Sequence, residues 1–117
     1  MTHFSDLIRS QRESLLANDR SYSLRQVASR IGVEPTYLSK VERGEVPPPS
    51  EKVIKKLALE LKQDPDVLLA MAGKVSEDLR EIICKRPQMF AELIRQMKEA
   101  PDHAILRVVR KVKDGNW

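Results

Sequence analysis

Apolar residues recur at spacings of three and four along almost the whole chain, and runs of alternating β-branched residues are absent. This periodicity predicts an all-α protein. A first helix is expected to end near Asn18 and to be followed by a polar loop over residues 18–21. Its apolar stripe comprises Phe4, Leu7, Ile8 and Leu15.

Two short helices follow, and each has recognisable residues at both ends. Ser23 is expected to cap the second helix, with Gln26 at the capping-box position, where each side chain bonds the other's unpaired N–H. Gly32 should end this helix, because glycine tolerates the left-handed backbone of a helix end. Pro35 suits the first turn of a third helix, which Gly44 ends. The expected inward positions are Val27, Ala28, Ile31, Leu38 and Val41.

Three consecutive prolines then predict an extended connector over residues 46–49, because a proline disfavours helix at the residue before it. Ser50 should cap a fourth helix, and Pro65 should open a short fifth one that extends to Ala72. The inward positions of the fourth helix are Val53, Ile54, Leu57, Ala58 and Leu61.

Gly73 is the expected boundary between an N-terminal domain, residues 1–73, and a C-terminal helical segment, residues 74–117. Three further helices should begin at Ser76, Pro87 and Pro101. Their apolar stripes are wider than so short a segment needs to cover itself, so we expect this segment to form a dimer interface. The residues expected there are Phe90, Ile94, Ile105, Leu106, Val109 and Trp117.

The composition favours an anionic partner only weakly. The chain has 117 residues, of which 41% are hydrophobic and 32% charged, with a net charge of +4. It shows neither a signal-peptide core nor an apolar run long enough to cross a bilayer, so a cytoplasmic protein without a membrane partner is expected. The single cysteine, Cys84, is expected to be a small, partly buried hydrophobic residue.

The most informative pattern lies between Ser23 and Gly44. Two helices that cross steeply through a short turn need a small residue where they touch, which Ala28 supplies. They also need a turn residue that tolerates positive φ, which Gly32 supplies. This register predicts a helix-turn-helix unit that binds double-stranded DNA. The residues left on the outer face of its second helix, where base edges are read, are Pro35, Thr36, Ser39 and Lys40.

Over these residues the chain resembles the Cro/C1-type (XRE) helix-turn-helix family of transcriptional regulators. The likeness extends from about Leu7 to Ala72 and implies a five-helix, lambda-repressor-like DNA-binding bundle, to which the C-terminal three-helix segment is appended. The residues that carry the resemblance are Ser23, Val27, Ala28, Gly32, Val33, Leu38, Ser39, Val41, Glu42, Arg43 and Gly44.

The resemblance also implies roles for single residues. Arg12 is expected to form a structural pair with Glu42, and Arg43 to reach the phosphate backbone. The chain departs from the family at Leu24, where a glutamine that often helps to hold phosphate is usual. Further phosphate contacts suit the chemistry of Tyr37, Lys52, Lys55 and Lys56, although the three lysines could equally form an ordinary charged outer face.

These observations lead to the hypothesis of a sequence-specific transcriptional regulator, most often a repressor in this family, that binds a two-fold DNA site as a homodimer. One alternative is an antitoxin whose C-terminal helices bind a partner toxin. Another, which the resemblance alone suggests, is a repressor controlled by a partner peptidase. His3 and His103 have no cysteine or carboxylate at metal-ligand spacing, so no metal and no cofactor are expected. The sequence offers no nucleophile or acid–base set, so an enzyme is the poorest hypothesis.

Overall fold

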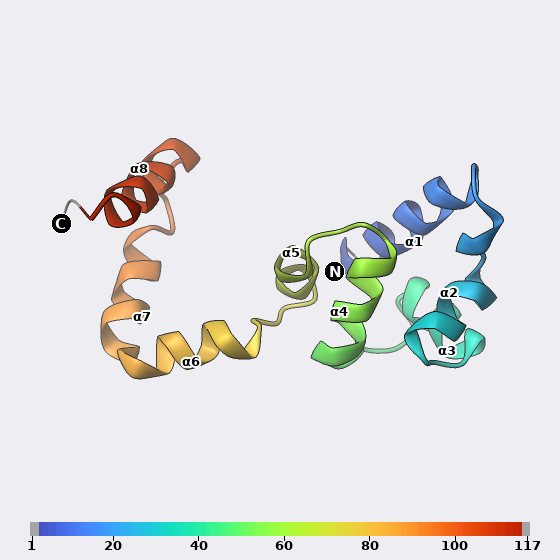
Figure 1. The fold of residues 1–117 in the computed structure, drawn as a ribbon. Coiled ribbons are helices and arrows are strands. Elements are labelled where there is room, and N and C mark those ends of the chain that lie inside the picture. The colour runs from blue at the N-terminus through green and yellow to red at the C-terminus, as the bar shows by residue number, and fades with distance from the viewer. Residues whose placement is uncertain (1–2, 116–117) are drawn as a thin grey trace. The chain divides into compact units, whose positions relative to one another are not determined.

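The computed structural model describes residues 3–115, without the side chain of His3, and every regular element in that range is helical. The all-α prediction is therefore confirmed. The elements follow one another as α1 His3–Leu16, η1 Arg20–Tyr22 (a 3-10 turn), α2 Leu24–Ile31, α3 Pro35–Glu42, α4 Glu51–Glu60, α5 Pro65–Met71, α6 Glu77–Lys85, α7 Pro87–Gln96 and α8 Asp102–Lys113 (Figure 1).

The chain divides into two compact units, Met1–Ser76 and Glu77–Trp117, which we call unit 1 and unit 2. The division falls three residues after Gly73. Gly73 itself has the left-handed backbone, with φ of +76°, that follows the end of α5.

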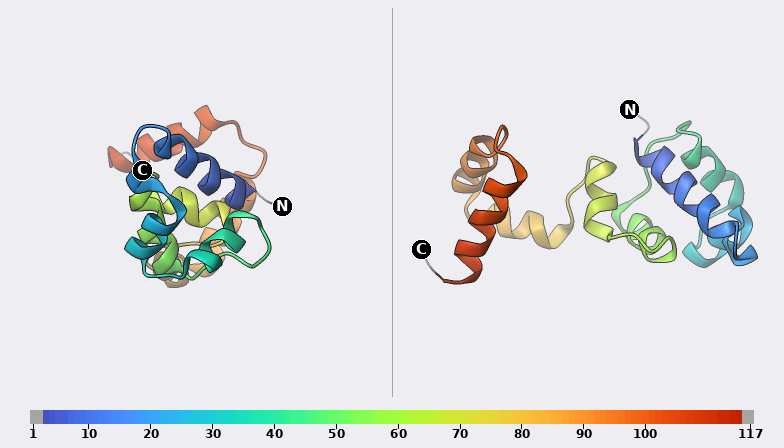
Figure 2. Two further views of the ribbon diagram at one scale, coloured as in Figure 1. Left: turned by 90° about the vertical axis from the view of Figure 1, so that its right-hand side faces the viewer. Right: turned by 90° about the horizontal axis from the view of Figure 1, so that it is seen from above.

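Unit 1 closes around one apolar core to which all of its α-helices contribute. In that core, α4 contacts α2 and α5, while α1 contacts α3 and α5 (Figures 1 and 2). The buried side chains are Phe4, Ile8, Val27, Ala28, Ile31, Leu38, Val41, Ile54, Leu57, Ala58, Leu61, Leu68 and Leu69. The helical periodicity of the sequence identified the inward faces of α1–α4, with Leu7, Leu15 and Val53 partly rather than fully buried, but it did not name Leu68 and Leu69 of α5.

Side-chain caps begin three of these helices, as Ser50 does for α4 and Asp64 for α5. At α2, Ser23 Oγ accepts from the amide of Gln26 at 3.2 Å. The reciprocal half of the expected capping box is not made, which corrects that prediction. The amide of Ser23 donates instead to the carbonyl of Arg20 at 3.2 Å, in the turn that precedes α2.

The stretch before α2 is more ordered than the polar loop expected from the sequence. Asp19 Oδ1 accepts from the amide of Ser21 at 2.9 Å and from its hydroxyl at 2.8 Å, and this cap begins η1. The backbone hydrogen bond from Ser21, followed by the hydroxyl bond, lowers the pKa of Asp19. A turn of three residues is too short to show in a periodic pattern, which is why sequence analysis missed it.

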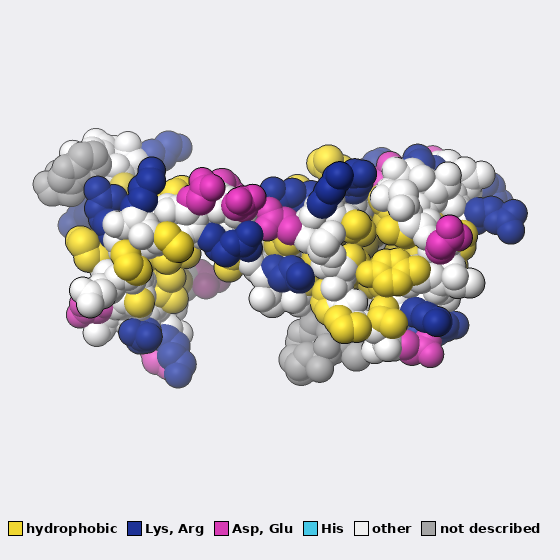
Figure 3. Space-filling model, turned by 90° about the horizontal axis from the view of Figure 1, so that it is seen from below, with side chains coloured by type: hydrophobic (Ala, Val, Ile, Leu, Met, Phe, Trp, Pro, Cys, Tyr) yellow, Lys and Arg dark blue, Asp and Glu magenta, His cyan; other side chains and the backbone are white. Residues whose placement is uncertain are grey.

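Unit 2 lacks a comparable core. α6 contacts α7, whereas α8 makes no contact of similar extent with either helix in the part of the unit that the structure describes. No described residue of these three helices is buried. Cys84 is exposed, which corrects its expected partial burial, because α6 lacks the cover that this prediction assumed. Hydrophobic side chains gather on the surface of this unit (Figure 3).

Candidate nucleic-acid interface

The helices α2 and α3 are joined by a turn of three residues whose backbone is determined locally. Gly32 ends α2 in the left-handed conformation, with φ of +78° and ψ of 33°. The amide of Val33 donates to the carbonyl of Ala28 at 3.0 Å, and the Val33 side chain packs against the core. Ala28 is fully buried, which lets the two helices cross closely. The turn thus brings α3 into contact with α2 (Figures 1 and 2).

A buried ion pair holds α1 against α3. Arg12 donates through Nε to Glu42 Oε2 at 2.7 Å and through Nη2 to Glu42 Oε1 at 2.9 Å. The two side chains are only 9% and 6% exposed. Nη1 of Arg12 also donates to the carbonyl of Tyr22 at 3.2 Å, so the same guanidinium reaches η1. The hydrogen bond to Glu42 raises the pKa of Arg12, although burial acts in the opposite direction.

Burial separates the two sides of α3. Leu38 and Val41 are buried, and Glu42 is held by its ion pair. Of the four residues expected to read bases, Thr36 and Lys40 are exposed, and the other two, Pro35 and Ser39, are partly buried. Thr36 and Lys40 are therefore the most accessible of the expected reading residues, while the opposite side of α3 lies in the core.

The residues expected at phosphates differ in their freedom. Arg43 is exposed, but its Nε donates to the carboxylate of Glu45. Tyr37 is partly buried and packs against the core. Lys55 forms an ion pair of 3.0 Å with Glu51, on the same helix. Lys52 and Lys56 are both exposed on α4.

A hollow of about 190 Å³ lies where α1, α2 and α3 meet. It is lined by Arg9, Arg12, Glu13, Leu24, Ser39, Glu42 and Arg43. The family's usual glutamine would place an amide at the position of Leu24, whereas here the side chain at this edge is apolar. The buried ion pair and two residues of the predicted DNA-binding face, Ser39 and Arg43, therefore line the same hollow.

Sequence reasoning missed two contacts, one at this face and one that joins other elements of unit 1. The carboxylate of Glu45 binds Arg43 and would compete with any other anion for it. Both residues lie at the end of α3, where the helical pattern of the sequence gives no sign of such a contact. Arg30 donates to Glu60 Oε2 at 2.7 Å, and its guanidinium lies 5.5 Å from the centre of the Tyr22 ring. This second clamp joins α2 to α4 and η1, over separations that local spacing cannot indicate.

The residues expected at a dimer interface lie on the open surface of unit 2. Ile94, Leu106 and Val109 are exposed, and Phe90 and Ile105 are partly buried. Trp117 lies outside the described residues. Apolar side chains exposed on neighbouring helices favour association with another protein surface.

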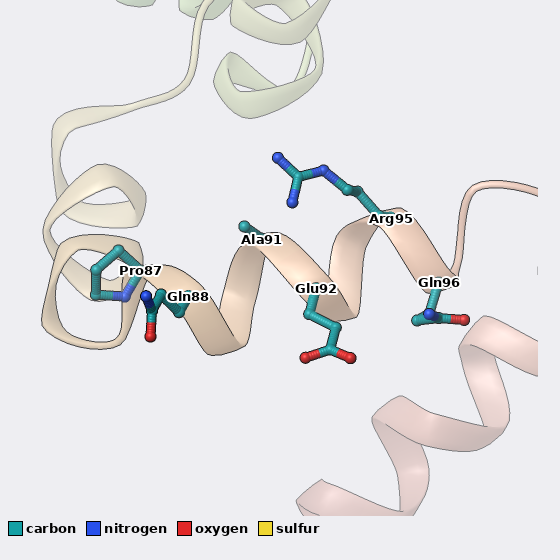
Figure 4. A pocket seen from close by; sticks show the side chains of 6 residues that line it. All are labelled: Pro87, Gln88, Ala91, Glu92, Arg95 and Gln96. Carbon is teal, nitrogen blue, oxygen red and sulfur yellow. The ribbon is translucent and has the colours of Figure 1, made fainter.

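The hollow in unit 2 does not have the character of a small-molecule site. An open hollow of about 530 Å³ runs along α7, but its lining residues all come from this one helix. Glu92 and Arg95 point away from one another there, so no set of polar groups converges (Figure 4). No group of three or more His, Cys, Asp or Glu residues among the described positions is arranged to hold a metal ion. None of the described helices is both long enough and apolar enough to span a membrane.

Comparison with known proteins agrees with this geometry. Residues 9–68, more than half of the chain, match the model of a helix-turn-helix family. Uncharacterised HTH-type transcriptional regulators from two strains of Mycobacterium tuberculosis are each 44% identical to the chain over 66 residues. This match covers 56% of the chain and 43% of each relative, so the chain spans less than half the length of the curated relatives it matches. No solved structure gives a significant match. The resemblance seen in the sequence is confirmed, and the chain belongs to the XRE-type helix-turn-helix family.

Proposed function

We propose that this protein is a sequence-specific transcriptional regulator, acting as a repressor, that binds a two-fold DNA site as a homodimer in the cytoplasm. The observation that carries the proposal is the two-sided character of α3. Its inner side is locked by Leu38, Val41 and the Glu42 ion pair, while Thr36 and Lys40 are exposed. A helix held in this way by a tight turn suits insertion into the major groove.

The exposed side chains of α3 suit direct reading of bases. The Lys40 ammonium can donate to the O6 and N7 acceptors of guanine. Thr36 offers a hydroxyl to a base edge and a methyl group to the methyl of thymine. Lys52 and Lys56 suit phosphates, which orient the protein without selecting a sequence. Binding, and not catalysis, is the activity that these groups support.

Homodimerisation is supported by the amount of apolar surface on unit 2. Nine large apolar side chains of α6–α8 are between 39% and 69% exposed. Because full burial of one such side chain contributes about 1.5–3 kcal/mol, covering the exposed half of all nine would contribute roughly 10 kcal/mol. At about 25 cal/mol per Å² this is roughly 400 Å² of apolar surface per copy. With about 57% of an interface apolar, each copy would bury roughly 700 Å², close to the amount in stable complexes.

A dimer through unit 2 would hold two reading helices in one assembly. Half-sites about 34 Å apart would then be read together, so the operator should be a palindrome. In this division of labour, residues 1–73 read DNA and residues 74–117 dimerise. Repression needs nothing more than occupancy of a site that overlaps a promoter.

Selection of bound duplexes from a random pool tests the sequence reading and should return a two-fold site. With that operator, Lys40→Ala should lose about 1–3 kcal/mol of specific binding and much less non-specific binding. Arg43→Ala is the phosphate control and should weaken all sequences about equally. If both variants lose the same affinity on every sequence, α3 does not read bases.

Sedimentation of the full chain at micromolar concentration tests the dimer. Val109→Asp puts a charge on the apolar side of α8 and should give a monomer. Val67→Asp, a change of a valine in unit 1 that is 51% exposed against 54% for Val109, is the matched control and should sediment as the wild type does. Sedimentation of the wild type as a monomer would refute the homodimer.

A second candidate function rests on the same exposed surface of unit 2. A toxin, as in an antitoxin complex, or a controlling peptidase could cover it in place of a second copy. A monomeric wild type that forms a complex with a small protein from a neighbouring gene would favour this candidate.

A further inference from the structure

One side of α8 is rich in Lys and Arg residues, and the proposed function assigns no role to them. Arg107, Arg110, Lys111 and Lys113 fall within seven residues, and residues 103–113 include no carboxylate. Asp102 and Asp114 flank this stretch, so residues 102–114 have a net charge of +2.

Three of the four cations of α8 lie on a different side from its main apolar stripe, whereas Lys113 lies beside Leu106 and Val109. At 100° per residue, Arg107, Arg110 and Lys111 cluster on one side, and Ile105 and Val109 lie on the other. All four cations are exposed, and within the described part of the chain none of them has an ion-pair partner. An exposed cluster of cations of this kind attracts a polyanion.

On the proposed DNA-binding face of unit 1, Lys40, Lys52 and Lys56 are exposed, but two further cations there are engaged by carboxylates. Arg43 is engaged by Glu45, and Lys55 pairs with Glu51. Glu34 adds an exposed carboxylate just before α3. Since the affinity of a protein for DNA depends strongly on the number of phosphates that it neutralises, a second cationic surface would add substantially to binding.

We propose that the basic side of α8 binds the phosphate backbone of the same DNA duplex that unit 1 reads. The contact is independent of base sequence, because Lys and Arg side chains at phosphates place a protein without selecting bases. The inference rests on DNA binding by this chain, but not on the operator, on repression or on a particular dimer geometry.

Among polyanions, the structure favours DNA over a lipid surface. A basic amphipathic helix can also bind anionic lipid, but it then inserts its apolar side between the acyl chains. In α8 that side bears Val109 and the neighbouring exposed apolar residues, whose cover is proposed to be a second copy. DNA is the polyanion that the first unit of the same chain is built to bind, which brings it within reach of α8 at high effective concentration.

The test uses the full chain and a 30-base-pair duplex of random sequence, with affinity measured by fluorescence anisotropy at several salt concentrations. The variant R107Q/R110Q/K111Q/K113Q should bind more weakly, and the slope of log K against log [salt] should become shallower by about 0.9 for each lost contact. The matched control K85Q/R86Q/R95Q/K98Q removes the same charge from α6, α7 and the residues beside them and should keep a slope close to that of the wild type.

Variants with fewer substitutions control for the possibility that the fourfold change unfolds the protein. R107Q/K111Q and R110Q/K113Q should each make about half of the change in slope, while R107K/R110K keeps the charge and should keep the slope. Equal slopes for the wild type and the α8 variants would overturn the inference, and so would equal losses for the α8 variant and its control. An unchanged DNA slope together with α8-dependent binding to phosphatidylserine vesicles would assign α8 to lipid instead. A wild type that binds no duplex would overturn the proposed function as well, so the two failures are distinguishable.

Discussion

Arg12 and Glu42 should contribute to the stability of unit 1 only together. Either residue should destabilise the fold when its partner is removed. Substituting Glu42→Leu leaves a guanidinium that is only 9% exposed without its carboxylate. Arg12→Leu leaves the carboxylate unpaired and also removes the 3.2 Å hydrogen bond to the carbonyl of Tyr22. Because each single change strands a buried charge, each should cost about 3–5 kcal/mol of unfolding free energy.

The double variant R12L/E42L should be far more stable than the sum of the two single changes. It removes both charges, and an apolar pair can replace a buried ion pair with little net cost. Only the carbonyl of Tyr22 stays without its donor, which costs about 1–3 kcal/mol. The double change should therefore destabilise unit 1 by about 1–3 kcal/mol, whereas additive effects would amount to roughly 6–10 kcal/mol.

Urea unfolding of the full chain can isolate unit 1 spectroscopically. Both tyrosines, Tyr22 and Tyr37, lie in unit 1, and the single tryptophan is Trp117, so second-derivative tyrosine absorbance follows this unit. The exposed pair of Arg9 and Glu13, whose side chains are 55% and 53% exposed, is the matched control and should couple by only about 0.3–0.5 kcal/mol. Additive effects at Arg12 and Glu42 would refute the reasoning, because they would mean that neither residue depends on the other.

Three further predictions concern the turn, the phosphate contact and the cap of η1. Gly32→Ala should cost about 1–2 kcal/mol in the same urea assay through backbone strain alone, since a Cβ there meets nothing within 4 Å, and a larger loss would point to a clash instead. Glu45→Gln should release Arg43 and tighten binding to operator and random DNA alike in anisotropy titrations; weaker binding would show that the carboxylate positions the arginine productively. The lowered pKa of Asp19 means that its carboxylate stabilises the fold above the ordinary pKa of 3.8 and that this contribution is lost as the pH falls through the lowered value. The stability difference between the wild type and Asp19→Ala should therefore shrink in strongly acidic solution, and a difference that grows there would contradict the assignment.

The amino-acid sequence alone was sufficient to identify the α-helices of unit 1 and the helix-turn-helix within it. Ser23, Pro35 and Ser50 act on the backbone of their immediate neighbours, so their effect on helix ends can be read locally. The same holds for Gly32, whose left-handed conformation follows from the lack of a side chain. The accessible side of α3 was also predictable, because the positions of Leu38 and its apolar neighbours repeat with the period of a helix.

Tertiary structure alone decided the contacts that join distant segments and the cover that each side chain receives. The resemblance implied the pairing of Arg12 with Glu42, but not the third bond to Tyr22, which depends on the order of η1. Arg30 meets Glu60 only after α2 and α4 pack together. Burial is likewise a property of the assembled neighbours, which is why an apolar neighbourhood in the sequence misled the prediction for Cys84. A periodic pattern reports which side of a helix is apolar, whereas the partner that covers that side is a matter of three-dimensional packing.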